Sequence, residues 1–208
     1  MLQSLSMALL SLFGWNLEKK IPEDNKILII GAPHTSNWDF PLTLLAMSAL
    51  GLRFSWIGKH TLFRGPIGSL YRRIGGIPVN RKASSGFINE IVQSFAARDV
   101  LRLAIAPEGT RSKGDHWKAG FYRIAVQADI KICLGFIDYT TKTIGLGPTL
   151  MPSKDIAADF ELIKEFYKEK TGKHPHKKST IRLREKEILL FEKEYGQPAA
   201  VQDEGAET

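Results

Sequence analysis

The chain has 208 residues, of which 43% are hydrophobic and 25% charged, and this balance excludes a disordered or collagen-like protein. Its single cysteine, Cys133, can form neither an intramolecular disulfide nor a cysteine-rich zinc site, so a reducing, cytoplasmic setting is expected. The formal net charge is +7, with 29 Lys and Arg against 22 Asp and Glu.

The positive charge is concentrated in one tract of the sequence. No acidic residue lies between Asp39 and Glu90, and seven cationic residues do, so the rest of the chain sums to zero. A localised basic tract indicates an anionic partner, which could be nucleic acid, a membrane surface or a phosphorylated substrate. The seven cationic residues are Arg53, Lys59, Arg64, Arg72, Arg73, Arg81 and Lys82.

The first segment, from Met1 to Trp15, is apolar, with leucines recurring at helical spacing. A helix of this length is about 22 Å long, shorter than the roughly 30 Å hydrocarbon core of a bilayer, so it should not span one. Phe13 and Trp15, followed by Lys19 and Lys20, are typical of interfacial anchoring. Residues 1–20 are therefore predicted to form an interfacial amphipathic helix; packing on the protein's own core is the alternative.

Short apolar runs alternate with helical patterns from Lys26 onward. This alternation favours an α/β fold, a single domain at 21–198 with a mostly parallel central sheet flanked by helices, followed by a disordered acidic tail at 199–208. Strands are predicted at 27–30, 54–57, 77–79, 101–106 and 132–137. Helices are predicted at 39–50, from Ser84 or Ser85 onward, at 119–127, and after Met151 with Ser153 as the N-cap.

A histidine and an aspartate follow the first predicted strand, and folds of this class bind ligands beyond the carboxyl ends of their strands. On one continuous helix His34 and Asp39 would be about 140° apart, so they converge only if His34 lies on the turn and Asp39 at the helix start. A carboxylate bound to one imidazole nitrogen leaves the other free as a base, which suits deprotonation of an alcohol. The alternative is a loop histidine beside an aspartate that merely favours the helix N-terminus.

Two arginines follow two further strands. Arg81 comes after the strand at 77–79, and Arg111 after the strand at 101–106. Guanidiniums in these places offer forked donors that match a phosphate, and the backbone at Gly109 can approach an anion closely. The alternative is an ordinary turn with a solvated arginine.

His174, His176, Lys177 and Lys178 form a second polar cluster near the C-terminus. A solvated loop after the last predicted helix is expected here. A metal-binding or anionic-lipid patch is the alternative.

Four motifs together resemble the 1-acylglycerol-3-phosphate (lysophosphatidate) acyltransferase family, over about residues 27–137. They are His34-x4-Asp39, Gly58-Lys59 with Arg64 to Gly68, Ile77 to Arg81, and Pro107 to Ser112. The resemblance implies that His34 is a general base and Asp39 its orienting partner. It also implies that the phosphate of the substrate is bound by Lys59, Arg81, Glu108, Gly109, Thr110 and Arg111.

The resemblance implies a peripheral or monotopic enzyme of phospholipid synthesis at the cytoplasmic face of a membrane. It would move a fatty acyl group from acyl-CoA or acyl carrier protein to the free hydroxyl of a lysophosphatidate-type acceptor. Direct attack is expected, because no Gly-x-Ser-x-Gly motif is present and Cys133 lies in an apolar run. No cofactor and no metal ion is expected, and the oligomeric state stays open.

Three alternatives to this function stay open. The acceptor could be a different lysolipid or another amine or hydroxyl compound, or the protein could bind lipid without catalysis. A basic nucleic-acid-binding module is the alternative from another class; no motif of that class accompanies the basic tract, so no nucleic-acid partner is expected.

Overall fold

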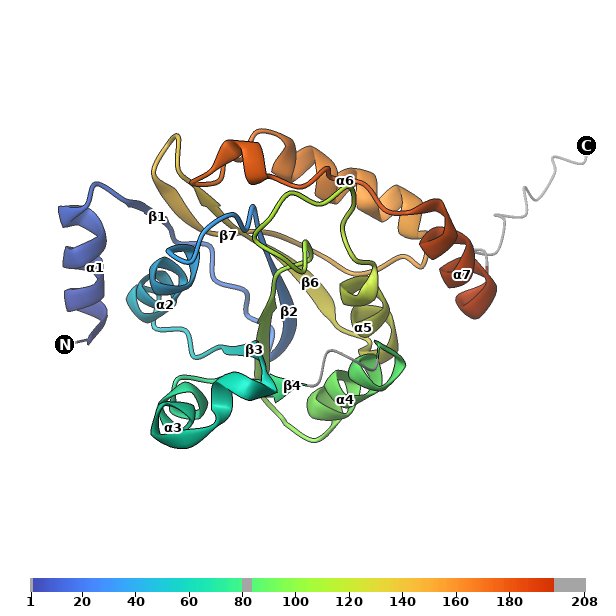
Figure 1. Cartoon of the computed structure of the whole chain (residues 1–208), viewed down its shortest axis with the longest axis horizontal. Helices are drawn as coiled ribbons and strands as arrows, with labels where there is room; N and C mark the ends of the chain where they lie inside the picture. Colours follow the sequence, from blue (N-terminus) through green and yellow to red (C-terminus); the bar gives the residue numbers. More distant parts are fainter. Residues whose placement is uncertain (1, 80–83, 197–208) are drawn as a thin grey trace, which may run out of the picture.

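A seven-stranded sheet forms the centre of the protein in a computed structural model, which describes residues 2–79 and 84–196 (Figure 1). In chain order the strands are β1 (Asn16–Glu18), β2 (Lys26–Ala32), β3 (Ser55–Lys59), β4 (Gly76–Val79), β5 (Leu101–Ile105), β6 (Lys131–Asp138) and β7 (Thr143–Leu150). Across the sheet their order is β1-β7-β6-β2-β5-β3-β4. Only β6 and β7 pair antiparallel, which confirms the predicted α/β fold with a mostly parallel sheet.

Helices cover both faces of the sheet (Figure 1). They are α1 (Leu2–Leu12), α2 (Asp39–Ala49), α3 (Gly65–Arg73), α4 (Ser84–Ala96), α5 (Gly120–Ala128), α6 (Ile156–Lys168) and α7 (Glu185–Tyr195), with 3-10 turns η1 (His60–Phe63) and η2 (Pro175–Lys177). Side chains alternate between faces along β2: Ile27 and Ile29 pack under α1 and α2, whereas Leu28 and Ile30 pack under α4, α5, α6 and α7. A strand buried on both faces needs an unbroken apolar run, which is what the sequence provides.

Each predicted strand and helix is present, and most ends differ by a few residues. The predicted helix at 1–20 is too long, because α1 ends at Leu12 and Asn16–Glu18 form a strand that pairs with β7. Two strands and two α-helices were not predicted: β1, β7, α3 and α7. The predicted cap of α6 is wrong, because Asp155 caps the helix by accepting a hydrogen bond from the Ala158 amide at 2.9 Å. Ser153 lies two residues too early, and its hydroxyl donates instead to the buried carboxylate of Asp159.

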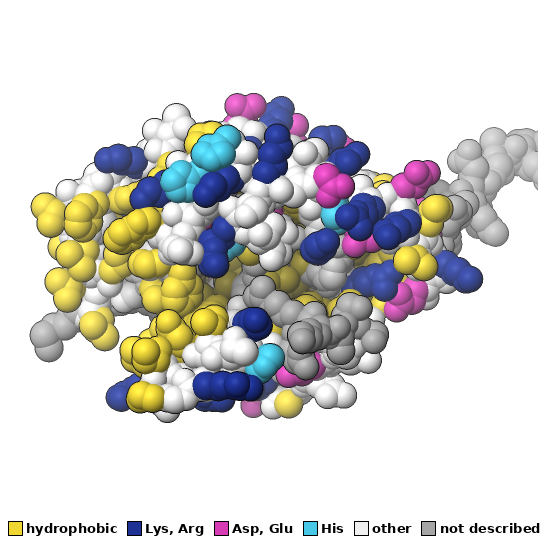
Figure 2. Space-filling model, in the orientation of Figure 1, with side chains coloured by type: hydrophobic (Ala, Val, Ile, Leu, Met, Phe, Trp, Pro, Cys, Tyr) yellow, Lys and Arg dark blue, Asp and Glu magenta, His cyan; other side chains and the backbone are white. Residues whose placement is uncertain are grey.

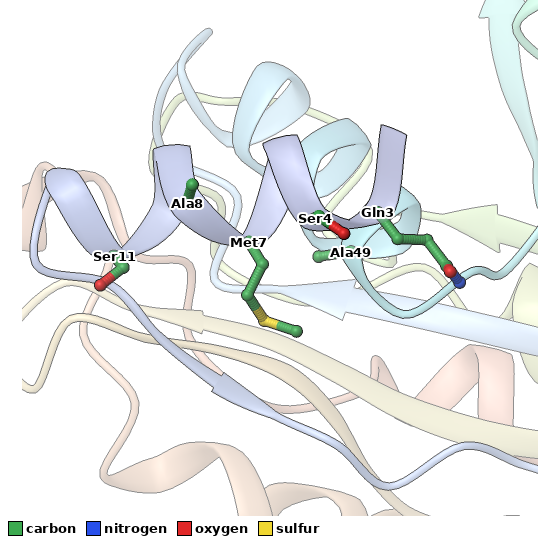
Figure 3. Close-up of a pocket in the computed structure, with 6 residues that line it drawn as sticks. All are labelled: Gln3, Ser4, Met7, Ala8, Ser11 and Ala49. Carbon is green, nitrogen blue, oxygen red and sulfur yellow. The ribbon is translucent and has the colours of Figure 1, made fainter. Parts of the chain in front are cut away.

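Helix α1 packs along α2 at one end of the molecule (Figure 1). The Ser6 hydroxyl donates to that of Ser48 at 2.9 Å, and Leu10 is buried in the core. Side chains on another side of α1, among them Ser4, Met7 and Ser11, line a hollow beside Ala49 (Figure 3). Leu2, Leu5 and Leu12 stay exposed, so α1 is anchored by one side and presents leucines on the other.

No helix within the described residues has the length and apolar character needed to cross a bilayer. The predicted acidic tail at 199–208 lies outside the described residues.

The chain that follows α6 returns across the carboxyl ends of the strands. The His174 amide donates to the Thr35 hydroxyl at 3.2 Å, and Lys178 donates through its ammonium to the carbonyls of Tyr167, Lys168 and Lys170 at the end of α6. Burial lowers the pKa of Lys178. The expectation of a solvated loop holds for His176, which is exposed, whereas His174 and Lys178 are half-buried because this segment packs against the turn that carries His34.

Candidate active site

His34 and Asp39 form a hydrogen-bonded pair beyond the end of β2. Nδ1 of His34, on the turn, lies 3.1 Å from Oδ2 of Asp39, the first residue of α2. The geometry is the one that the sequence required for convergence. An ionised carboxylate only accepts hydrogen bonds, so Nδ1 carries the proton and the lone pair is on Nε2. The imidazole is therefore held in the tautomer that a general base needs.

The carboxylate of Asp39 is itself fixed by donors from the turn. Oδ2 also accepts from the amides of Thr35 and Ser36 at 3.0 and 2.9 Å, and Oδ1 accepts from the Tyr139 hydroxyl at 2.8 Å. Asp39 is only 3% exposed, and hydrogen bonds of this kind offset the cost of burying its charge. The pair is thus built into the turn rather than left to side-chain mobility.

Glu108 holds the turn from its other side. Oε1 of Glu108 accepts from the amide of His34 at 2.6 Å, and Oε2 accepts from the amide of Ser179 at 3.1 Å. The side chain is 3% exposed, and both carboxylate oxygens are engaged by protein amides. The predicted role of Glu108 as a phosphate ligand does not fit this position. A negatively charged carboxylate that is buried and bound to amides repels a phosphate. Glu108 instead connects the His34 turn to the C-terminal segment.

A cleft of about 1380 Å³ opens where the strands end, and His34 and Asp39 line it. Of the predicted phosphate ligands, four line the same cleft: Lys59, Gly109, Thr110 and Arg111. Gly109 has a φ of +71°, which favours glycine at this turn. Arg81 lies outside the described residues. The structure thus brings a candidate base and several candidate anion ligands to one cavity.

Sequence reasoning missed Lys118 and Arg123, which add two more cations to the lining of the cleft. Lys118 packs close to Gly109. Its Cγ lies 3.6 Å from the point where a Cβ on that glycine would be. Tyr139 and Ser179 were missed as well, although they bind Asp39 and Glu108. For Tyr139, the signal available in the sequence was its place two residues after the predicted strand at 132–137.

Two groups bear on the chemistry that the cleft can support. Burial raises the pKa of the Cys133 thiol to about 12, so this cysteine is not a thiolate nucleophile at neutral pH. Within residues 2–79 and 84–196, no three His, Cys, Asp or Glu side chains converge as metal ligands would. The arrangement can accept a proton at His34 from a substrate whose anionic group is held by the cations of the cleft.

The chain is similar to known proteins in family and in fold. A family model described as Acyltransferase matches residues 16–134. No curated protein matches the chain. A crystal structure of the 1-acyl-sn-glycerophosphate (LPA) acyltransferase PlsC from Thermotoga maritima is similar with a TM-score of 0.55, covering 80% of this chain and 74% of that one at 17% identity. At this identity the likeness shows the fold.

Proposed function

The chain belongs to the acyltransferase family, whose model matches more than half of its residues, and from this premise we propose that it acylates a lysophosphatidate-type acceptor at a membrane surface. The observation that carries the proposal is the His34–Asp39 pair in a cleft that Lys59 and Arg111 also line. The motif resemblance agrees with the family and gives the same acceptor class. The similar Thermotoga maritima structure is of an LPA acyltransferase, which supports this acceptor.

The proposed reaction is direct transfer between a thioester and an alcohol. Nε2 of His34 takes the proton of the acceptor hydroxyl while the hydroxyl oxygen forms a bond to the carbonyl carbon of the thioester. The carbon–sulfur bond then breaks, and the proton goes to the departing thiolate of CoA or of acyl carrier protein. Asp39 holds the imidazole in its tautomer and stabilises the imidazolium that forms between these steps. No acyl-enzyme is needed, and no protein cofactor is proposed.

Cations in the cleft are proposed to orient the acceptor by its phosphate. Lys59 and Arg111 are exposed side chains that line the cleft, and Gly109 and Thr110 lie beside Arg111. A guanidinium can bind phosphate in bidentate fashion, which fixes the acceptor hydroxyl close to the base. Arg81 stays a sequence-based candidate for the same role.

Replacing Arg111 by alanine is expected to raise KM for a phosphate-bearing acceptor about tenfold or more, because a charge-assisted hydrogen bond is lost. KM for a lysolipid without a phosphate should stay within about twofold. The measurement is acyl transfer to both acceptors, each with an acyl-CoA and with an acyl carrier protein donor.

Lys113→Ala is the matched control for Arg111→Ala. Lys113 is an exposed cation two positions from Arg111 and is not among the residues that line the cleft. Its loss should leave KM unchanged for the phosphate-bearing acceptor and for the lysolipid without a phosphate. Equal losses for both acceptors in Arg111→Ala would contradict the proposed phosphate contact.

The membrane surface is proposed to contact α1 and α3. Figure 2 shows hydrophobic side chains gathered over α1, α2 and α3, beside the hollow in the middle of this face. Exposed apolar residues there include Leu5, Leu12, Ile67 and Leu70. Four exposed cations of the basic tract lie at the end of β3 and on or next to α3, and they would favour an anionic lipid surface: Lys59, Arg64, Arg72 and Arg73.

Leu5 and Leu12 replaced together by serine should weaken binding to vesicles containing anionic lipid by about tenfold or more, because apolar area that would leave water is removed. Co-sedimentation with vesicles measures the binding without any assay of activity. Leu162 and Leu189 replaced together by serine are the control, since these leucines are also more than half exposed but lie on α6 and α7. Equal loss of binding in both pairs would show that the α1 surface is not the contact.

A further inference from the structure

Tyr139 binds Oδ1 of Asp39, the carboxylate oxygen that receives no hydrogen bond from the turn that carries His34. The amides of Thr35 and Ser36 and the ring of His34 all bind Oδ2 of Asp39. Oδ1 accepts only the Tyr139 hydroxyl, at 2.8 Å, among the described residues. Rotation of the carboxylate about its Cβ–Cγ bond moves both oxygens, so the tyrosine adds a restraint at Oδ1 to those that the turn places on Oδ2.

The tyrosine ring is held in place by two distant parts of the chain. The Tyr139 amide donates to the carbonyl of Thr171 at 2.8 Å, in the segment after α6. The Trp15 ring, just before β1, meets the Tyr139 ring edge-on with centroids 5.1 Å apart. The neighbouring Asp138 fixes the same turn by accepting from the amides of Thr140 and Thr171. These contacts hold the backbone and the ring of Tyr139 so that its hydroxyl meets Asp39.

The hydroxyl also keeps its proton under ordinary conditions. Burial, together with the hydrogen bond to Asp39 and its negative charge, raises the pKa of Tyr139 well above the usual value. The group thus stays a neutral donor throughout the pH range in which a histidine base works. This is the behaviour of a group that orients a carboxylate and takes no part in the proton transfer.

We propose that Tyr139 is a positioning residue for the His34–Asp39 pair, acting through Oδ1 of Asp39. The proposal rests on the proposed function, because it needs Asp39 to orient the base. Fixing both carboxylate oxygens fixes the plane in which Nδ1 of His34 finds its partner. Without the tyrosine, the imidazole would be held in its productive orientation for a smaller fraction of the time.

Tyr139→Phe tests the proposal, since it deletes the hydroxyl and keeps the ring against Trp15. The expected result is a fall of about tenfold in kcat with KM for donor and acceptor unchanged, because substrates still bind while the base is misaligned. A purely structural role would lower the thermal midpoint and leave the kcat of the folded fraction unchanged. Tyr195→Phe, which removes a hydroxyl on α7 that contacts Gln127 and Glu194 and does not line the cleft, is the control and should leave kcat and KM unchanged.

A second substitution separates this proposal from the one on which it rests. In an Asp39→Asn background, measured at high enzyme concentration, Tyr139→Phe should cause no further loss, because the two changes act on one contact. Additive losses, or an unchanged kcat in Tyr139→Phe alone, would overturn the positioning role. Full turnover in Asp39→Asn alone would instead remove the proposed catalytic pair, and Tyr139 with it.

Discussion

Replacing His34 by alanine is expected to lower kcat by on the order of 10³-fold, because the acceptor hydroxyl loses the group that takes its proton. The bond between Nδ1 of His34 and Asp39 leaves Nε2 as the only ring nitrogen with a lone pair. Binding of the substrates depends on other side chains, so KM should change little. Initial rates with an acyl-CoA donor and lysophosphatidate, over a range of both concentrations, measure the two constants.

His176→Ala is the matched control for this experiment. His176 is an exposed imidazole on η2 that does not line the cleft, and its removal should leave kcat unchanged. Thermal unfolding of His34→Ala should resemble that of the wild type, since the side chain is partly exposed. Turnover of the His34→Ala protein close to the wild-type rate would show that another group is the base.

The parts of the fold that could be predicted are those that leave a signal in a short stretch of sequence. Ile27 to Ile30 form an unbroken apolar run because β2 is covered on both faces, and the polar residues after it could only lie at the sheet edge. The approach of His34 to Asp39 followed from the same reasoning, since the two residues are five positions apart.

The elements that were not predicted lack that local signal. β7 carries two glycines and a proline within eight residues, and α7 buries only Phe191 among its many charged side chains. α3 begins with Gly65 and Pro66 and contains Gly68, where an added Cβ would lie 2.2 Å from the Phe63 carbonyl oxygen. The local propensity of these segments for strand or helix is weak, so their conformation is determined by packing against the rest of the protein.

The support of the site could not be predicted because its contacts join distant parts of the chain. Tyr139 and Asp39 are 100 positions apart, and Ser179 and Glu108 are 71 apart. Glu108 lies in a motif with Arg111, which made a shared phosphate site the natural expectation. Only the fold shows that the chain turns the carboxylate inward, toward two backbone amides, and the arginine outward into the cleft.

Glu108→Ala is expected to lower the free energy of unfolding by about 2–6 kcal/mol, since two amides are left without a partner and each costs about 1–3 kcal/mol. The amides affected are those of His34 and Ser179. Lys178 would also lose a favourable charge nearby, because the Glu108 carboxylate raises the pKa of that lysine against the effect of burial. Urea unfolding followed by tryptophan fluorescence measures the change in stability.

Glu108→Gln separates the role of Glu108 in the turn from its general contribution to stability. One amide oxygen can still accept from His34 or from Ser179, but the –NH₂ group then faces the other backbone N–H, and two donors repel. The folded Gln variant should therefore turn over more slowly, since the His34 turn is held on one side only. Glu161→Gln is the control, because its exposed ion pair with Lys164 contributes little to stability. Wild-type stability and turnover in Glu108→Gln would mean that the two amide contacts do not hold the turn, and would reopen a direct role for Glu108 in binding substrate.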